Sequence, residues 1–244
     1  MKILITSGGT LEKIDQVRSI TNNSTGEMGL KICNELSKIE GVEIYYLNTK
    51  TSMKPKNGFL FNVYPIEVND TQSVHDKMKE IIQTNKIDYV IHAMAISDYK
   101  VEKVFTCENV DNALNQSVIT NSEDLLNHLE GIDTSSKISS NLDTMFIQLT
   151  KTPKIIDLIK EWDSNIRLIS FKLLTDASEE RLTKISKKQK SRTKSDVVIG
   201  NTINNDGSYK ILWVQKKKAK ELKNKKEVAK RISKYIQKTY NKPL

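Results

Sequence analysis

Short apolar runs alternate with amphipathic segments of helical period through the first half of the chain. Residues 2–6 (K-I-L-I-T) and 87–96 (I-D-Y-V-I-H-A-M-A-I, the longest apolar run) predict strands, and residues 26–39 and 74–83 predict helices. This alternation is typical of a mostly parallel sheet, because a parallel partner strand is reached only by a long crossover. We therefore predict an α/β, Rossmann-like, doubly wound sheet with helices on both faces and a small antiparallel excursion.

The rest of the chain continues this alternation. Further strands are predicted at residues 42–47, 59–68, 145–149, 168–174, 196–199 and 209–214, and further helices at residues 155–162, 179–190 and 219–240. Residues 98–137 have the weakest periodicity, and we expect a mobile flap within 98–140. Because neither a linker nor an internal repeat is visible, we predict a single domain over residues 1–244. Ligands of such sheets bind beyond the carboxyl ends of the strands, so the loops at 7–26 and 97–101 are candidate binding loops.

Length and composition limit the class of protein. The chain has 244 residues, and no apolar stretch approaches the roughly 20 residues of a membrane-spanning helix. Met1 and Lys2 lead straight into I-L-I, which is too short for a signal peptide. We therefore expect a soluble, cytoplasmic protein with no membrane partner. The two cysteines, Cys33 and Cys107, lack metal-ligand spacing, so neither a zinc site nor a disulfide scaffold is predicted.

The formal charge of +9 is concentrated in the C-terminal part of the chain. Residues 187–244 contain 18 Lys and Arg against 4 Asp and Glu, whereas residues 1–186 contain 21 against 26. A basic tail of this kind leaves open the hypothesis of a nucleic-acid-binding protein. However, the lysines interleave with a regular apolar stripe, as on an amphipathic helix with a solvated face, and the few aromatic residues form no stacking platform. We therefore predict no nucleic-acid partner.

The loop after the first predicted strand contains two adjacent glycines, Gly8 and Gly9. Backbone N–H groups in such a loop can approach an anion, and the alternative is a tight structural turn. The loop matches neither G-x-G-x-x-G nor a Walker motif, and Asn48-Thr49 at the end of the second strand offers no acidic ribose partner. An NAD(P)-dependent oxidoreductase is therefore the less favoured hypothesis.

Five polar residues, 21–25, lead into the helix predicted to begin at Gly26. A helix N-terminus with free N–H groups favours a phosphate or carboxylate, whereas a simple N-cap needs only one such residue. Asp98 ends the predicted central strand and could contact a ribose hydroxyl, a base amino group or a metal ion, or could only form a turn. His92 lies inside the apolar run and is predicted to be a core residue. No nucleophilic triad or Cys-His pair is evident, so we expect catalysis by positioning and charge stabilisation.

Taken together, residues 4–29 resemble the phosphopantothenate–cysteine ligase family. The family writes this stretch approximately as I-T-x-G-G-T-x-E-x-I-D-x-V-R-x-I-x-N-x-S-S/T-G-x-M-G. Later segments resemble the family in the same order, at residues 95–99 (A-I-S-D-Y), 137–140 (K-I-S-S), 152–155 (T-P-K-I), 170–173 (S-F-K-L) and 196–201 (D-V-V-I-G-N). The resemblance covers nearly the whole chain, and we expect the free-standing bacterial form because no flavin-binding decarboxylase domain precedes it.

The resemblance implies a reaction in coenzyme A biosynthesis. A nucleoside triphosphate activates 4′-phosphopantothenate to an acyl-nucleotide with release of pyrophosphate, and the amine of cysteine then attacks to give 4′-phosphopantothenoylcysteine. Bacterial members of this type mostly use CTP and eukaryotic relatives use ATP, with Mg²⁺ held mainly by the triphosphate. Members are homodimers whose active sites are completed across the interface.

The resemblance also implies roles for individual residues. Asn22 is the catalytic residue, whose amide would orient the acyl-nucleotide. The residues that would bind phosphopantothenate are Ser24, Gly26, Arg18 and Ala95. The residues that would bind the nucleotide are Gly8, Gly9, Asp98, Lys137, Pro153, Lys154, Ile155, Ile156, Phe171, Lys190 and Lys194, with Arg192 competing for the role of the last two. The family's Glu-Thr after the phenylalanine is Leu174-Thr175 here, so a carboxylate is missing from that loop.

Overall fold

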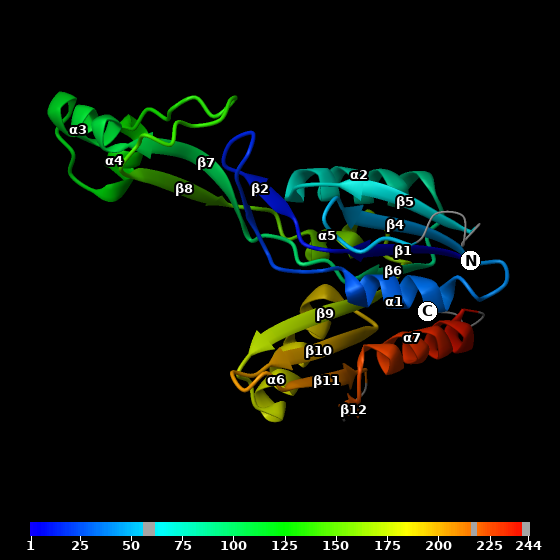
Figure 1. Cartoon of the computed structure of the whole chain (residues 1–244). Coiled ribbons are helices and arrows are strands. Elements are labelled where there is room, and N and C mark those ends of the chain that lie inside the picture. Colours follow the sequence, from blue (N-terminus) through cyan, green and yellow to red (C-terminus); the bar gives the residue numbers. More distant parts are fainter. Residues whose placement is uncertain (56–61, 216–218, 241–244) are drawn as a thin grey trace.

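The computed structural model describes residues 1–55, 62–215 and 219–240, and its centre is an eight-stranded sheet. The strands are β1 (Lys2–Ser7), β4 (Glu43–Thr49), β5 (Val63–Val68), β6 (Tyr89–His92), β9 (Arg167–Thr175), β10 (Val197–Ile203), β11 (Tyr209–Val214) and β12 (Lys220–Leu222). Their order is β12-β11-β10-β9-β6-β1-β4-β5, and all neighbours from β10 to β5 are parallel (Figure 1). At one edge of this sheet, β11 pairs antiparallel with both β10 and β12. The predicted mostly parallel sheet is confirmed.

Helices cover both faces of the sheet, as predicted. One face carries α1 (Glu27–Leu36) and α7 (Lys225–Thr239), and the other carries α2 (Thr71–Thr84), α5 (Ile155–Trp162) and α6 (Glu179–Thr193). Alternate residues of β1 serve the two faces: Ile3 and Ile5 pack in the core with α1 and α7, and Leu4 packs in the core with α2 and α5. Because both faces are buried, the strands are almost continuously apolar.

The strand order reverses beside β1. From β1 the chain proceeds outward to β4 and β5, and then returns through α2 to β6 on the opposite side of β1. Connections therefore leave the carboxyl ends of β1 and β6 in opposite directions. This switch point is where open parallel sheets bind their ligands.

A long excursion connects β6 to α5. It consists of β7 (Tyr99–Thr106), α3 (Cys107–Gln116), α4 (Ser122–His128) and β8 (Met145–Lys151), and we call residues 99–151 the arm. The arm projects from the sheet as an antiparallel pair with its own small core, and the hairpin β2 (Leu11–Lys13) and β3 (Ser19–Thr21) lies beside its base (Figure 1). The predicted antiparallel excursion is confirmed, but it contains regular elements where the weak periodicity indicated none. Its mobility stays a prediction.

Several predicted elements have different bounds in the structure, and three of them are informative. The closing helix was predicted from residue 219 but begins at Lys225, because Leu222 pairs with Ile211 and is buried in the core as part of β12. The Asn224 side chain then caps the helix by accepting from Glu227 N at 3.0 Å. The strand at 87–96 ends at His92, where the chain leaves the sheet edge. The strand at 59–68 begins at Val63, and its residues 59–61 lie outside the described residues.

Helix α1 lies directly on the end of β1 because Gly29 has no side chain. A Cβ atom at Gly29 would lie 2.6 Å from Ser7 Cβ and even closer to Ser7 Oγ. The Ser7 hydroxyl occupies this space and donates to the Gly26 carbonyl at 3.0 Å. The contact places the N-terminus of α1 at the carboxyl edge of the sheet.

We expect Gly29→Ala to lower the free energy of unfolding by about 1–3 kcal/mol, the usual effect of overpacking a rigid contact. Gly131→Ala is the matched control, since its added Cβ meets only ordinary contacts from 3.4 Å. Urea unfolding of both variants measures the difference. Equal free energies of unfolding for the two variants would show that α1 can move away from β1 without any loss of stability.

Candidate active site

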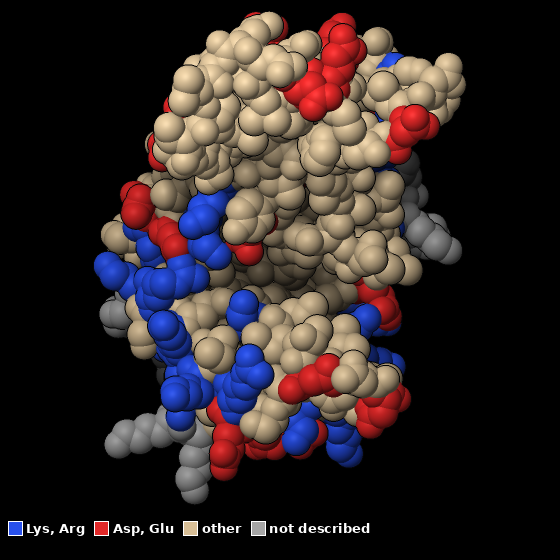
Figure 2. Space-filling view, turned by 90° about the vertical axis from the view of Figure 1, so that its left-hand side faces the viewer, with Lys and Arg blue, Asp and Glu red and all other residues tan. Residues whose placement is uncertain are grey.

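A cavity of about 600 Å³ lies at the carboxyl ends of β6, β9 and β10, beside the switch point. Its volume is in the usual range for small-molecule sites. Seen from this side, the molecule is hollowed beneath the arm, and Lys and Arg gather around and below the hollow, whereas few lie above it (Figure 2). The cavity is lined by Asn22, Asn23, Ser24, Met28, His92, Ala93, Met94, Ala95, Ile96, Ser97, Asp98, Pro153, Lys154, Ile155, Ile156, Phe171, Lys172, Leu173, Gln189, Arg192, Asn201 and Lys225.

The loop with Asn22 is held against the turn that follows β1. A Cβ atom at Gly9 would collide with the carbonyl oxygen of Asn22, so only glycine permits this approach. The turn is itself paired with the loop after β6: Ala95 N donates to Gly8 O at 2.8 Å and Thr10 N donates to Ala95 O at 3.1 Å. These contacts fix the backbone of Asn22 and Ala95 on opposite sides of one rigid turn. Close packing therefore explains why glycine occupies both positions of this turn. A contact of either glycine with the nucleotide stays a prediction.

The N-terminus of α1 is suited to an anion. Its N-cap is Gly26, which has no side chain to cap the helix, and Thr25 Oγ1 accepts from Glu27 N at 3.4 Å. The polar residues 21–25 therefore occupy one donor of the first turn with a long hydrogen bond, and the other backbone donors of that turn remain for a ligand. Glu27 adds a negative charge to this turn, but Lys225 and Lys31 pair with it and hold its pKa below its ordinary value. The structure thus neutralises the carboxylate that would repel an anion.

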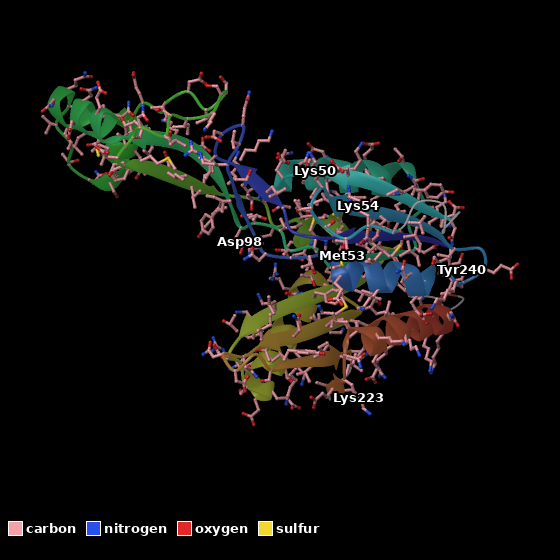
Figure 3. The ribbon with its side chains drawn as sticks, viewed as in Figure 1. Lys50, Met53, Lys54, Asp98, Lys223 and Tyr240 are labelled. Carbon is pink, nitrogen blue, oxygen red and sulfur yellow. The ribbon has the colours of Figure 1, made fainter. Side chains whose placement is uncertain are left out.

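The opposite end of the cavity lies where the arm leaves the sheet. Asp98 stands at this point (Figure 3), and its carboxylate pairs with Lys154 Nζ at 3.1 Å. Thr152 joins the two strands of the neck, because its N–H donates to Asp98 O at 3.0 Å and its hydroxyl donates to Ser97 O at 2.6 Å. Both charged side chains are largely exposed, so their pairing contributes little energy and leaves them available to a ligand.

His92 forms part of the cavity wall at the end of β6. Its ring is held through Nδ1, which lies 3.0 Å from Thr6 Oγ1 on β1. Burial lowers the pKa of His92 from its ordinary 6.5 to about 4, so the imidazole is neutral at physiological pH. The side chain was predicted to be a core residue, and it is buried, but it also faces the cavity.

Arg18 and Lys137 lie outside the cavity wall. The Arg18 guanidinium pairs with Asp15 and donates to Ile138 O at 2.9 Å, and the Asp15 carboxylate accepts from Ile138 N at 3.1 Å. Burial favours the neutral carboxyl of Asp15, but hydrogen bonds from Arg18, Val17 and Ile138 outweigh it and hold its pKa well below its usual range. This cluster attaches the hairpin β2–β3 to the backbone beside Lys137.

The structure brings most of the predicted site residues together. Those that line the cavity are Asn22, Ser24, Ala95, Asp98, Pro153, Lys154, Ile155, Ile156 and Phe171. Those that do not are Gly8, Gly9, Arg18, Gly26, Lys137, Lys190 and Lys194. On α6 the basic residue of the wall is Arg192, which pairs with Asp157 in the first turn of α5. The ligand contacts of all these residues stay predictions.

Several cavity residues were not predicted. Lys225 was assigned with the solvated lysines of the closing helix, but it is the first residue of α7 and reaches the cavity beside α1. Gln189 comes from α6 and belongs to no motif, whereas Asn201 of β10 ends the family-like segment at residues 196–201 but had no predicted role. Asn224 before Lys225 is a helix-start signal that could have placed this lysine at the sheet edge. No sequence signal marks Gln189.

A metal site built by the protein is not found. In the part of the chain that the structure describes, no three His, Cys, Asp or Glu side chains are grouped to hold a metal ion. The same residues include no helix that is long and apolar enough to cross a membrane.

Comparison with known proteins identifies the family. Residues 1–134 match the family model described as DNA/pantothenate metabolism flavoprotein C-terminal domain. The chain belongs to this family. A solved structure of the DNA/pantothenate metabolism flavoprotein from Streptococcus pneumoniae is 34% identical, with a TM-score of 0.82, and the match covers 98% of this chain and 99% of that one. The fold of this member is therefore that of the family.

Two further relatives extend the comparison. The coenzyme A biosynthesis bifunctional protein CoaBC of Thermococcus kodakarensis is 32% identical over 241 residues, which cover 97% of this chain and 51% of the relative. The family member described here thus spans about half the length of the curated relatives it matches. A Cab2 variant in complex with phosphopantothenate-cysteine has a TM-score of 0.65 over 98% of this chain and 89% of that one, and at 17% identity it shows the fold alone.

We expect His92 to make the protein less stable as the pH falls from about 6.5 to 4.5. In this range the unfolded state binds a proton at His92 that the native state excludes, because its native pKa is about 4. The free energy of unfolding therefore falls by at most about 1.4 kcal/mol per pH unit. Urea unfolding across this range should show a smaller fall for His92→Gln, which retains the other histidines. An identical pH dependence would mean that His92 is protonated in the native state.

Proposed function

We propose that the chain is a phosphopantothenate–cysteine ligase. It joins 4′-phosphopantothenate to L-cysteine through an acyl-nucleotide, with CTP favoured over ATP as the activating nucleotide. The carrying observation is that one cavity collects Asn22 and Ser24 from the loop before α1 with Asp98 and residues 153–156 at the opposite end. The coenzyme A biosynthesis role named for the relatives and the ligand of the Cab2 complex support this assignment.

In the first step, the carboxylate of phosphopantothenate attacks the α-phosphorus of the nucleotide. A carboxyl oxygen–phosphorus bond forms, the bond to the β-phosphate oxygen breaks, and pyrophosphate leaves. Negative charge accumulates on the phosphates, so cations and helix N-termini are the useful groups. Arg192, Lys154 and the N-terminus of α5 lie on this wall. Asp98 is the carboxylate of the cavity that would contact an Mg²⁺ ion held by the triphosphate, and such an ion would neutralise part of the phosphate charge.

In the second step, the cysteine amine attacks the acyl carbon. A carbon–nitrogen bond forms, the amine loses a proton to solvent, and the nucleoside monophosphate leaves with the electron pair of the acyl–oxygen bond. Asn22 can donate its side-chain amide to the oxygen on which charge develops, which is the role of an oxyanion donor. Ser24 and the N-terminus of α1 hold the substrate's phosphate beside it.

A homodimer would give Arg18 and Lys137 a use. Both lie on projecting parts of the molecule, the hairpin β2–β3 and the arm, and neither lines the cavity of its own chain. In a homodimer these residues can complete the partner's site. The oxidoreductase hypothesis gains no support from the Gly8-Gly9 turn, because its glycines are explained by close packing against Thr49, Ser52 and Asn22.

We expect Asn22→Ala to separate the two steps. With phosphopantothenate, Mg²⁺ and CTP but no cysteine, the variant should still form the acyl-nucleotide and release pyrophosphate. Transfer to cysteine should fall by about a hundredfold or more, the usual loss of one oxyanion donor. Asn34→Ala, on the exposed side of α1, is the control. Absence of pyrophosphate from the unmodified protein with both CTP and ATP would refute the ligase, and normal transfer by the variant would refute the role of Asn22.

We expect Arg192 to contact the nucleotide in preference to its lysine neighbours. Arg192→Met should raise the KM for the nucleotide about tenfold or more, since a charge-assisted hydrogen bond is lost. Lys190→Met and Lys194→Met, which remove a charge from the same helix end outside the cavity, should change it less. Steady-state kinetics of the three variants make the comparison, and a larger effect of either lysine would reverse the assignment.

A further inference from the structure

Polar side chains interrupt the core beneath the cavity. Thr6, His92 and Ser170 lie side by side on β1, β6 and β9, as their register shows. They stand on the face whose core is otherwise built from Leu and Val residues of these strands with α2 and α5. Thr6 and Ser170 are fully buried and His92 is 7% exposed. Burying polar groups lowers the stability of a core unless they form hydrogen bonds. A row of polar side chains at this place therefore points to a functional role.

Gln189 completes the row from α6, and its amide has one possible orientation. Its Nε2 donates to Ser170 Oγ at 3.0 Å and to the carbonyl oxygen of Phe171 at 3.1 Å. A carbonyl oxygen can only accept, so both hydrogens of Nε2 are in use and the remaining amide atom is Oε1. Oε1 has no hydrogen-bond partner within the described part of the chain, yet it is not sealed from solvent. Since Gln189 lines the cavity and its Nε2 is held by Ser170 and Phe171, Oε1 is the atom of this amide that is left for a ligand.

His92 supplies a second free atom on the same wall. Nδ1 is occupied by the Thr6 hydroxyl, and Nε2 lacks a partner among the described residues without being sealed from solvent. When the Thr6 hydroxyl donates to Nδ1, the single proton of the neutral ring is on Nε2, which is then a donor. His92 and Gln189 are connected through neighbouring positions, because His92 pairs in register with Ser170 and Gln189 contacts Ser170 directly.

We propose that His92 and Gln189 select the base of the nucleotide, with Nε2–H of His92 donating to a ring nitrogen and Oε1 of Gln189 accepting from the adjacent amino group. This inference rests on the proposed function, since it requires a nucleoside triphosphate in the cavity. Cytosine and adenine both present an unprotonated ring nitrogen beside an exocyclic amino group. Uracil presents a ring N–H beside a carbonyl, and guanine does so at N1 and O6, the edge that corresponds to N1 and the amino group of adenine; both oppose donor to donor and acceptor to acceptor. The pair therefore accepts CTP and ATP and rejects UTP and GTP.

The position of the row agrees with a base-binding role. Gln189 bonds the backbone of Phe171, and Phe171 and residues 153–156 are the proposed lining of the nucleotide pocket. The phosphate end is chemically different, with the cations Lys154 and Arg192 on the wall. His92 and Gln189 are uncharged, and each is held in one orientation by a hydrogen bond to a neighbouring residue. Such groups suit the uncharged edge of a base, because a fixed donor accepts only an acceptor and a fixed acceptor only a donor.

The test is direct binding of four nucleotides to the full chain in the presence of Mg²⁺, measured by calorimetry or by competition. CTP and ATP should bind at least about a hundredfold more tightly than UTP and GTP, at about tenfold for each mismatched hydrogen bond. Gln189→Met and His92→Phe should each weaken CTP and ATP about tenfold and leave UTP and GTP nearly unchanged. Gln83→Met, on the exposed side of α2, should behave as the unmodified protein.

Equal binding of UTP and CTP by the unmodified protein would overturn the inference, and so would variants that weaken all four nucleotides equally or none. Thr6→Val keeps the shape of the side chain and removes only the hydroxyl that fixes the ring, so it replaces the other variants if they fail to fold. The outcome is separable from the ligase assignment. Selective binding without pyrophosphate release would refute the ligase alone, whereas pyrophosphate release with UTP as fast as with CTP would refute the base selection alone.

Discussion

The close approach of α1 to β1 organises the rest of the structure. Without side chains at Gly26 and Gly29, the helix lies on Ser7, and its N-terminus ends beside the switch point of the sheet. Helix α7 then packs along α1, which brings Lys225 to Glu27. The helix N-terminus at the cavity, the lysine that pairs with its first-turn carboxylate and the packing of the last helix thus all follow from one contact between a glycine face and a serine.

The features that sequence predicts well here are those carried by local patterns. Continuous apolar strands and amphipathic helices indicated the doubly wound sheet, and the polar run 21–25 indicated the helix N-terminus near Asn22. The arm was harder, because its strands are partly exposed and its small core is formed by few residues. A strand such as Lys220–Leu222 is defined by its partner across the sheet and has no periodicity of its own.

The cavity wall was predicted where a motif marks it and missed where distant elements meet. Asp98 and residues 153–156 belong to recognisable segments, whereas the amide orientation of Gln189 is defined by its contacts with Phe171 and Ser170, which are distant in sequence. In the sequence, Lys225 cannot be distinguished from the solvated lysines around it. Only the position of the first turn of α7 shows that it reaches the cavity. Arg18 shows the reverse case, since its motif is clear but its side chain is used by Asp15 and Ile138. A sequence motif can identify a residue such as Arg18, but the tertiary contacts of its side chain determine whether it faces the cavity.

The neck of the arm has a mechanical consequence. Both strands of the arm leave the sheet together, joined by the hydrogen bonds of Thr152 to Asp98 and Ser97. This makes the neck the natural axis for any rotation of the arm against the sheet. A small angular displacement there carries α3, at the far end of the arm, through a wide arc but barely shifts Asp98 and Lys154, which lie at the pivot (Figure 1). The two ends of the insertion therefore differ in reach, and a longer or shorter arm can be accommodated without altering the cavity floor.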